Sequence, residues 1–178
     1  MSDTSTSTSS STTIQPETGR PLLPKDYGVP DSDEGTLPWS WAVERLTRAV
    51  NYWFSTTRPD GRPHAMPAWA VWLDDAVYFD GSPETRRGKN LAENPAIVIH
   101  LESGDEVIVL EGEAHLVGAP DRAFAERLAA ALGAKYGPKY VPSPDTWDEG
   151  GLYVMRPKVA FGWTEFPTTM TRWRFPGA

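Results

Sequence analysis

The sequence contains no cysteine. This excludes disulfides, thiolate nucleophiles and the zinc and iron–sulfur sites that depend on Cys ligands. Long apolar runs are also lacking, since none approaches the roughly 20 residues that a membrane-spanning helix needs. The N-terminus has no basic segment followed by an apolar one, which is the pattern of a secretory signal. We therefore expect a cytoplasmic protein.

An excess of positive charge is missing as well. The net charge is −7 and the isoelectric point is about 4.9, which argues against a nucleic-acid coat or a broad surface for anionic membranes. Tryptophan, in contrast, is abundant, with eight residues in a chain of 178. This length suffices for one domain with a real core and is too short for two comfortable ones.

The chain divides into an arm and a domain. Residues 1–13 are almost all Ser and Thr, a composition that cannot bury enough apolar surface to offset the entropy of ordering. Prolines punctuate the next stretch, to about residue 35. We expect residues 1–35 to be a disordered Ser/Thr-rich tail and a Pro-rich arm, with order beginning near Leu37, and residues 36–178 to form the domain.

Strands dominate the rest of the chain, and the helices lie at its periphery. Apolar residues recur at helical spacing over 39–50, 84–93 and 121–135. Alternating or β-branched segments bounded by turn residues predict strands at 50–57, 62–73, 76–80, 97–101, 107–116, 152–156, 159–164 and 170–175. Because neighbouring strands are joined by short links, we expect an all-β fold with peripheral helices, built as a small antiparallel barrel.

Standard catalytic signatures are absent from the sequence. It has no Gly-x-Ser-x-Gly elbow, no His-Glu-x-x-His, no Gly-x-Gly-x-x-Gly and no Walker A motif. The three histidines, His64, His100 and His115, fall on three different predicted strands. We therefore expect no metal site.

A cluster of cations opens the helix predicted at 84–93. Arg86, Arg87 and Lys89 lie in its first turn, where the helix dipole disfavours positive charge. A bound phosphate reverses that penalty, because free backbone N–H groups, Arg forks and the hydroxyl of Thr85 then converge on one anion. The alternative is a solvated basic turn.

The segment from Met66 to Trp69 has the features of an edge strand. Pro63 and Pro67 cannot donate hydrogen bonds to a neighbouring strand, so pairing there is interrupted. Free main-chain groups suit the pyrimidine end of an isoalloxazine ring, and Trp69 or Trp72 could cover its face. The alternative is an ordinary edge strand that proline protects from aggregation.

A third feature lies near the C-terminus, where aromatic and basic residues interleave. Trp163, Arg172 and Trp173 could stack on a flat heterocycle and pair with a phosphate. Cation–π packing on the rim of the barrel is the alternative.

Five motifs together carry a family resemblance. They are Arg58–His64, Val77–Pro83, Thr85–Leu91, Asn94-Pro95 and Leu110–Gly112. In order and spacing, the chain from about residue 38 to 175 resembles the pyridoxamine 5′-phosphate oxidase-like family of FMN-binding split barrels, whose relatives include enzymes that use the deazaflavin F420. The resemblance implies a six- to seven-stranded antiparallel split β-barrel that forms a homodimer, with two cofactor sites at the subunit interface and both chains lining each.

The resemblance also implies roles for individual residues. The cofactor phosphate would be held by Ser82, Thr85, Arg86, Arg87 and Lys89, and the isoalloxazine would lie along Met66, Pro67, Ala68 and Trp69. Trp163, Arg172 and Trp173 would close the site, from the same or the partner chain. Two positions depart from the family pattern. Thr85-Arg86-Arg87 replaces the usual Ser-Arg-Lys, and the C-terminal Arg-x-His that grips substrate phosphate is missing, because no histidine follows His115.

We therefore predict an FMN- or F420-dependent oxidoreductase that acts on a small molecule other than a B6 vitamer, with the cofactor performing the chemistry. No catalytic side chain is assigned. Replacing Arg87 with Ala is expected to abolish cofactor retention and leave the fold intact. The alternatives are a non-catalytic flavin- or haem-binding module, with His64 as the haem ligand to test, and an empty dimerisation scaffold.

Overall fold

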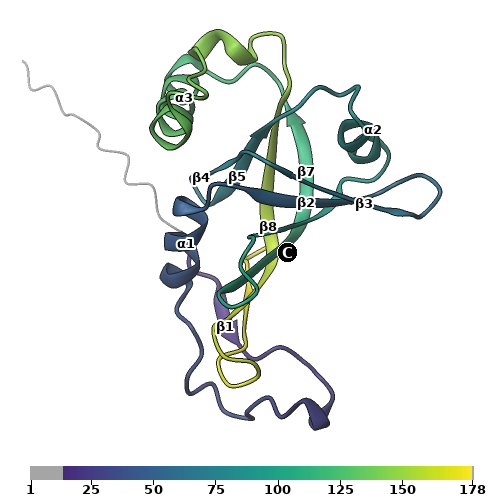
Figure 1. The fold of residues 1–178 in the computed structure, drawn as a ribbon, viewed down its shortest axis with the longest axis vertical. Coiled ribbons are helices and arrows are strands. Elements are labelled where there is room, and N and C mark those ends of the chain that lie inside the picture. The colour runs from purple at the N-terminus through teal and green to yellow at the C-terminus, as the bar shows by residue number, and fades with distance from the viewer. Residues whose placement is uncertain (1–13, 178) are drawn as a thin grey trace, which may run out of the picture.

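The fold is built around one long antiparallel strand pair. The structure, a computed structural model, describes residues 14–177, so the predicted disordered segment 1–13 lies outside the described residues. Strands β7 (Val107–Val117) and β8 (Leu152–Trp163) pair over the full length of β7 and form the spine of the sheet (Figure 1).

The described residues form a nine-stranded sheet that branches at β8. The main order is β1 (Glu17–Gly19), β9 (Thr171–Arg174), β8, β7, β6 (Ala96–His100), β2 (Tyr52–Thr57) and β3 (Pro63–Ala68). Strand β5 (Ala76–Asp80) pairs with both β8 and β4 (Val71–Leu73). The first residues of β8, 152–155, face β5, whereas residues 159–162 face β9. Strand β8 thus pairs with β5 along its first half and with β9 along its second half, and β5 and β9 do not pair with each other.

A β-bulge marks the point of branching. The register of β7 against β8 shifts between Glu111 and Gly112, and Lys158 is the extra residue. The freed carbonyl of Lys158 accepts a hydrogen bond from Phe175 N at 3.0 Å, which turns the C-terminus back onto the sheet. A Cβ at position 112 would lie 2.5 Å from Arg156 O, so the close approach of the two backbones there requires glycine.

The predicted fold class, an antiparallel split β-barrel with peripheral helices, is confirmed. Its strands differ from the expectation in three places. The single strand expected over 62–73 is divided by Trp69-Ala70 into β3 and β4, and the two strands expected over 152–164 are one continuous strand with a bulge. Strand β1 was not expected at all, because its three residues have no apolar pattern and are recruited by pairing with β9. The sheet therefore has nine strands rather than six or seven.

Tryptophans fill one end of the main core. Helix α1 (Trp39–Arg48) buries Trp39 against Trp173 and Phe175, with ring centroids 5.3 and 5.0 Å apart. Trp173 is completely buried, and its indole N–H donates to Leu37 O at 3.2 Å. The two tryptophans Trp39 and Trp173 therefore belong to the core.

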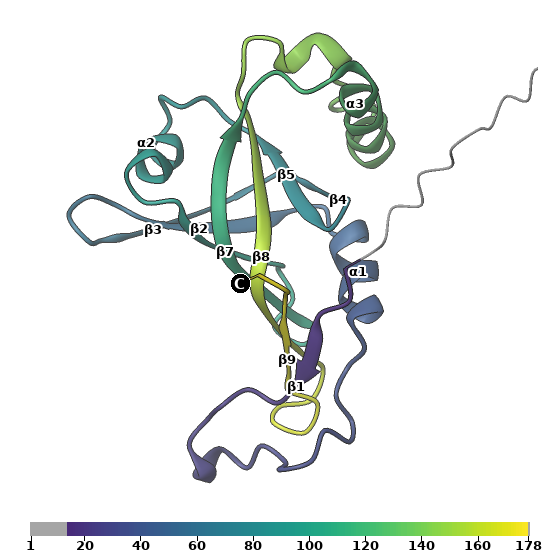
Figure 2. The same ribbon diagram turned by 180° about the vertical axis from the view of Figure 1, so that it is seen from behind.

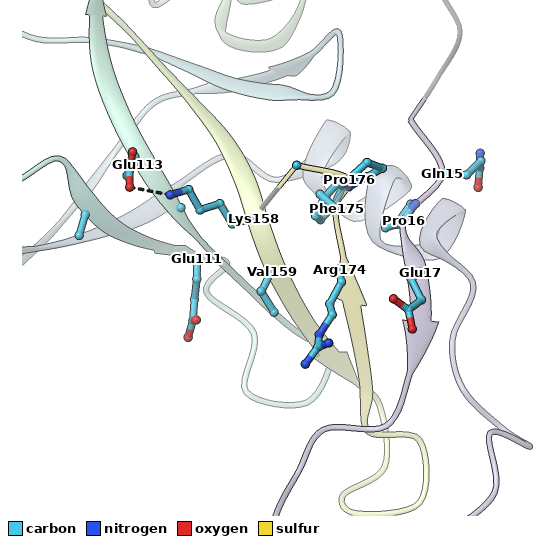
Figure 3. A pocket seen from close by; sticks show the side chains of 13 residues that line it. Gln15, Pro16, Glu17, Glu111, Glu113, Lys158, Val159, Arg174, Phe175 and Pro176 are labelled. Atoms are coloured by element: carbon cyan, nitrogen blue, oxygen red, sulfur yellow. Dashed lines mark hydrogen bonds and ion pairs between the residues drawn. The ribbon is translucent and has the colours of Figure 1, made fainter.

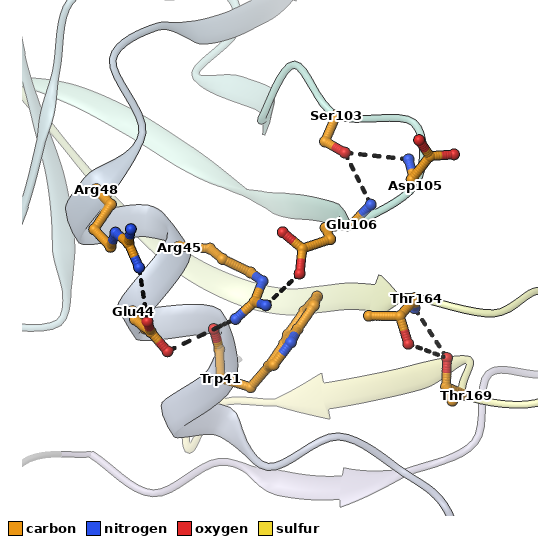
Figure 4. Close-up of polar contacts among 9 residues, drawn as sticks. All are labelled: Trp41, Glu44, Arg45, Arg48, Ser103, Asp105, Glu106, Thr164 and Thr169. Carbon is orange, nitrogen blue, oxygen red and sulfur yellow. Dashed lines mark hydrogen bonds and ion pairs between the residues drawn. The ribbon is translucent and has the colours of Figure 1, made fainter.

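Polar contacts fasten the outer side of α1 to the turn that precedes β7 (Figure 4). The Arg45 guanidinium lies 4.1 Å from the ring centroid of Trp41 and pairs with Glu106. Ser103 Oγ accepts a hydrogen bond from the backbone N–H of Glu106 at 2.8 Å. This contact fixes the turn that carries the Glu106 carboxylate.

A second, smaller core lies under helix α3 (Arg122–Tyr136), which covers the end of the sheet formed by β4 and β5 (Figure 2). Leu128 and Leu132 face this core, and the short helix η2 (Pro144–Trp147) adds Trp147, which is 1% exposed. Helix α2 (Arg86–Glu93) stands apart from α1 and α3, over the β2–β3 hairpin.

The arm before α1 is tied to the domain by the pairing of β1 with β9 and by the side chain of Arg20. The Arg20 guanidinium donates to Ser32 O and Glu34 O in the arm, and to Thr168 O and Met170 O before β9. The arm also contains η1 (Lys25–Tyr27). Within residues 14–177, the first element is β1, which begins at Glu17, ahead of the onset of order expected near Leu37.

Within residues 14–177, none of the helices has the length and apolar character needed to cross a membrane. The same part of the chain holds no group of three or more His, Cys, Asp or Glu arranged to bind a metal ion.

Replacing Trp173 with Ala should lower the free energy of unfolding by about 3–5 kcal/mol, because it leaves a cavity in the main core. Urea denaturation monitored by circular dichroism measures this loss. Trp69, which is 39% exposed, provides the comparison, and Trp69→Ala should lower it by only about 1 kcal/mol. Equal losses for the two variants would contradict the core role of Trp173.

Candidate anion and cofactor site

The start of α2 is held by a side-chain cap. Thr85 Oγ1 accepts from Gly88 N at 3.0 Å and donates to Ser82 O at 2.8 Å. The amides of Arg86 and Arg87 lie in the first turn of the helix, so no carbonyl one turn earlier in the helix accepts a hydrogen bond from them. The hydroxyl of Thr85, which was predicted to donate to a phosphate, already donates to the backbone, so its part in the site is to shape the turn.

Gly88 brings this helix into direct contact with the preceding turn. A Cβ at position 88 would lie 2.6 Å from Pro83 O and 2.7 Å from Ser82 O. These are backbone atoms that cannot swing away. The first turn of α2 and the 81–85 loop therefore form one tightly packed unit.

Arg87 packs against the main core. It is 6% exposed, and its guanidinium carbon lies 4.8 Å from the ring centroid of Phe54 and 4.9 Å from that of Phe79. Nη2 donates to Asp80 O at 2.8 Å, while the buried Nη1 has no hydrogen-bond partner among residues 14–177. Burial lowers the pKa of Arg87 below its usual range. An inward, desolvated and partly unpartnered guanidinium is well suited to receive an anion.

The other predicted phosphate contacts lie on the outside of the same turn. Ser82, Arg86 and Lys89 are exposed, and Lys89 Nζ lies 3.1 Å from a Glu84 carboxylate oxygen. Ser82 Oγ accepts a hydrogen bond from the backbone N–H of Glu84 at 3.1 Å. All five predicted phosphate residues thus gather at one end of α2, although only Arg87 is buried.

The β2–β3 hairpin supplies polar groups on the side facing α2. Asn90 Nδ2 donates to Thr56 Oγ1 at 2.9 Å, and Thr56 Oγ1 lies 3.5 Å from His64 Nδ1 across the strand pair. Burial, followed by the charges of Arg58, Arg86 and Arg87, lowers the pKa of His64 below its usual range. The hairpin and the helix therefore present their cations to a common region.

The predicted ring-binding segment forms the edge strand β3, as expected from its prolines. Met66 lies opposite Phe54 in the register, and Ala68 lies opposite Tyr52, so both share the face of the hairpin that Arg87 packs against. Pro67 is on the other face, opposite Trp53. Met66 is 41% exposed.

Trp69 occupies the break between β3 and β4. Its ring stacks on Tyr136, with centroids 4.8 Å apart and an angle of 14°, and lies 6.0 Å from Tyr140. Tyr140 in turn donates to Asp80 Oδ2 at 2.6 Å, and Asp80 O holds Arg87. A chain of direct contacts therefore links Trp69 to the start of α2.

Residues at the end of α3 form hydrogen bonds to the backbone at the break between β3 and β4. Lys135 Nζ donates to Ala70 O and to Tyr52 Oη, each at 3.0 Å, and Tyr136 Oη accepts from Ala70 N at 3.0 Å. Burial lowers the pKa of Lys135 to about 8. These contacts fix the backbone that directs Trp69 toward Tyr136.

The C-terminal residues predicted to close the site lie elsewhere in this chain. Trp163 ends β8 and Arg172 is in β9, at the opposite end of the molecule from α2 (Figures 1 and 2). Trp173 is fully buried against Trp39 and presents no surface to a ligand, so its prediction as a cofactor contact is corrected to a core role. Its aromatic contacts among the described residues are with Trp39 and Trp41 rather than with a cation, so the alternative of cation–π packing on the rim does not describe this tryptophan either.

Two clefts run along the open face of the sheet. One, of about 990 Å³, is shown in Figure 3 and lies between β7, β8, β9 and the start of β1. The second, of about 440 Å³, includes Thr56 and Pro63 near the turn of the hairpin. They share Ala96, Glu111 and Gly112, so the face is hollowed from the hairpin toward β9.

Arg58, Thr56 and Asn90 were not singled out from the sequence, and His64 was considered only as a haem ligand. Their placement follows from the crossing of α2 over the hairpin, which no local pattern encodes. The available signal was the position of Arg58 and His64 on either side of a tight turn, since strand pairing brings such residues together.

One family model matches most of the chain, and several solved structures share its fold. A family model described as pyridoxamine 5′-phosphate oxidase matches residues 42–163. No curated protein resembles the sequence closely enough to count as a match. A solved F420 reductase is similar in structure, with a TM-score of 0.51, 24% identity, and coverage of 66% of this chain and 93% of that one.

Two mycobacterial structures are also similar. A conserved hypothetical protein from Mycobacterium tuberculosis gives a TM-score of 0.58 at 17% identity, covering 82% of this chain and 89% of that one. A heme binding protein from Mycobacterium smegmatis gives 0.59 at 17% identity, covering 82% of this chain and 59% of that one. At such identities the likeness shows the fold.

Replacing Gly88 with Ala should destabilise the protein by about 1–3 kcal/mol, because the added methyl group meets backbone atoms. Helix propensity alone would favour Ala by about 1 kcal/mol, so the sign of the change decides between the two effects. Gly118→Ala is the control, since a Cβ there meets nothing within 4 Å. Thermal unfolding of both variants measures the difference, and a stabilised Gly88→Ala protein would refute the close contact.

Raising the pH above about 8 should stabilise the protein through Lys135. Its pKa is lower in the folded than in the unfolded chain, where it is about 10.4, so between these values only the unfolded state holds the proton. The free energy of unfolding should therefore rise from about pH 8 to 9.5, before tyrosine ionisation in the unfolded chain opposes it.

Urea denaturation across this pH range checks the effect. The rise should disappear in Lys135→Met and persist in Lys139→Met, which changes an exposed lysine in the following loop. A rise that survives in Lys135→Met would assign it to another group.

Proposed function

Because the chain belongs to the pyridoxamine 5′-phosphate oxidase family, we propose that it is an oxidoreductase that binds FMN, or alternatively F420, and acts on a small organic molecule. The observation that carries this proposal is the buried guanidinium of Arg87, whose Nη1 is unpartnered within residues 14–177 at the start of a capped helix. A cofactor with a phosphate group supplies the acceptor that this donor lacks.

The residues at the end of α2 fit a phosphate in charge as well as in hydrogen bonding. The first-turn amides and the N-terminal end of the helix dipole favour an anion. Arg86 and Lys89 on the exposed side add positive charge, and Lys89 would exchange its solvent-exposed partner Glu84 for the phosphate. Because an exposed ion pair contributes little, that exchange costs little.

The neighbouring edge strand fits the flat part of the cofactor. Strand β3 lies at the end of the sheet order, so the outward main-chain groups of Met66, Pro67 and Ala68 are free of strand partners in the described chain. An isoalloxazine or deazaflavin ring carries one N–H donor and two carbonyl acceptors that such an edge can meet. Trp69 stacks on Tyr136 and is 39% exposed, and it would lie beside the ring and limit the site at that end.

The site is proposed to be completed by a second copy of the chain. The hollowed face carries acids such as Glu111 and Glu113 together with the cations Lys158 and Arg174, so it has the mixed charge that a self-complementary interface needs. In a homodimer, Trp163 and Arg172 of one chain would approach the α2 site of the other. Their distance from α2 within one protomer supports a contribution across the interface.

The bound cofactor supplies the hydride chemistry, and the residues of the chain bind it, orient it and exclude water. Arg87, Arg86 and the first turn of α2 anchor the phosphate, which fixes the position of the ring along β3. The absence of a histidine after His115 removes the substrate-phosphate clamp expected for a B6 vitamer, so the substrate is proposed to be a different small molecule, reached in the cytoplasm.

A non-catalytic flavin- or haem-binding module is the second candidate. It is favoured by the similarity of the fold to that of a heme binding protein, and by His64, a histidine beside the site. An absorption spectrum separates the candidates. Bands are expected near about 370 and 450 nm for FMN, about 420 nm for F420 and about 400–415 nm for haem.

Arg86→Ala should weaken FMN or F420 binding by about tenfold to a hundredfold, since it removes one charge-assisted contact from an exposed position. Titration followed by cofactor fluorescence measures the dissociation constant. Arg62→Ala is the matched control, because Arg62 is an exposed arginine paired with Asp60 in the hairpin turn. Arg86 is preferred to Arg87, whose packing between Phe54 and Phe79 makes Arg87→Ala a change of the fold as well.

The wild-type protein is expected to bind one of the two cofactors and to pass a hydride between it and a substrate. A protein that binds neither on titration would overturn the proposal, as would an Arg86→Ala variant that binds both as tightly as the Arg62→Ala control.

A further inference from the structure

We infer that Arg58 and His64, on the β2–β3 hairpin, form the second half of the anion site, and that His64 takes up a proton when a dianion binds there. The inference deepens the proposed function, on which it rests, by assigning to the site two residues of this chain and a dependence of its affinity on pH.

The geometry places the two residues opposite the start of α2. Thr56 joins the two elements, because its hydroxyl accepts from Asn90 of α2 and lies 3.5 Å from His64 of β3. Arg58 immediately follows β2, so it stands at the same end of the hairpin as His64, and its charge acts on the imidazole together with those of Arg86 and Arg87. Hairpin and helix are thus two walls of one region.

Buried side-chain atoms without a hydrogen-bond partner occur on both the hairpin and the helix. Among residues 14–177, five buried side-chain nitrogen or oxygen atoms have no hydrogen-bond partner, and three of them belong to Arg58, Arg87 and Asn90. The first two are the donors Arg58 Nε and Arg87 Nη1. Because buried polar groups in proteins are nearly always paired, two orphaned guanidinium donors on facing elements point to an anion between them.

The charges that act on His64 are all positive. Arg58 comes from the hairpin, Arg86 and Arg87 come from α2, and the nearer polar groups, Thr56 and Asn90, are neutral. These cations oppose protonation of the imidazole and add to the effect of its burial. A dianion placed among them reverses the sign of the local field, so the pKa of His64 rises on binding.

The direction of the pH effect follows from this difference. Between the pKa of His64 in the free site and its pKa in the occupied site, binding is accompanied by uptake of a proton. Affinity for the dianion therefore increases as the pH falls through that window, and it levels off once the free site is itself protonated. Each unit by which the pKa rises corresponds to a tenfold change in affinity.

Sulfate is the probe of choice, because it remains a dianion throughout the range of about pH 5 to 8 in which histidine titrates. The pKa of His64 is measured by NMR of the imidazole protons with and without sulfate, and the sulfate affinity is measured at about pH 5.5 and 7.5. The protein has only three histidines, so the signals are assigned by comparing His64→Gln with His115→Gln.

We expect sulfate to raise the pKa of His64 by about one unit and to bind several-fold more tightly at the lower pH, with about tenfold as the upper limit. His64→Gln should lose this pH dependence, whereas His115→Gln, which changes an exposed histidine beside Glu113, should keep it. Arg58→Gln should weaken sulfate binding several-fold at both pH values, and Arg62→Gln, on the same turn, should leave it unchanged.

Two results would overturn the inference. One is a pKa of His64 that sulfate leaves unchanged in the wild-type protein, a measurement that needs no variant. The other is a pH dependence that survives in His64→Gln. The proposed function is tested separately by FMN and F420: tight cofactor binding without any response of His64 to sulfate refutes this inference alone, whereas sulfate binding without cofactor binding refutes the proposed function alone.

Discussion

The Arg87 guanidinium, held against the end of β5, is the contact on which the candidate site depends. It donates to Asp80 O and lies over the rings of Phe54 and Phe79, so one side chain fixes α2 to β5 and β2 at once. A buried guanidinium is costly unless its donors are satisfied. The same burial that makes it costly in an empty site makes it a strong partner for an anion, because the local dielectric is low.

Asp80 extends this connection to the far side of the sheet. Its carboxylate accepts from Tyr140 Oη and from Trp147 Nε1, both at 2.6 Å, while its carbonyl accepts from Arg87. The segment after α3 and the start of α2 are therefore anchored on the same residue. Together with the clamp of Lys135 on the break between β3 and β4, this arrangement sets the backbone of the predicted ring-binding edge before any ligand arrives.

The sequence predicted the elements that carry the candidate site better than the contacts within it. The cation-rich helix start and the proline-marked edge strand were both found from local signals, because dipole energetics and the missing N–H of proline act on a few consecutive residues. The inward direction of Arg87 was not predictable in this way, since it depends on Phe54, which is 33 residues earlier in the chain. For the same reason Trp173 was mistaken for a ligand contact: its burial is decided by Trp39 and Leu37, which pack on it from the other end of the sequence.

The central claim is that the phosphate of a flat cofactor is bound at the start of α2. The most direct test is a comparison of FMN with riboflavin, and of F420 with its dephosphorylated chromophore, in equilibrium titrations of the same protein. The account predicts that the phosphorylated member of at least one pair binds more than about tenfold more tightly than its partner, as expected from one or two charge-assisted hydrogen bonds. Equal affinities within both pairs would contradict it.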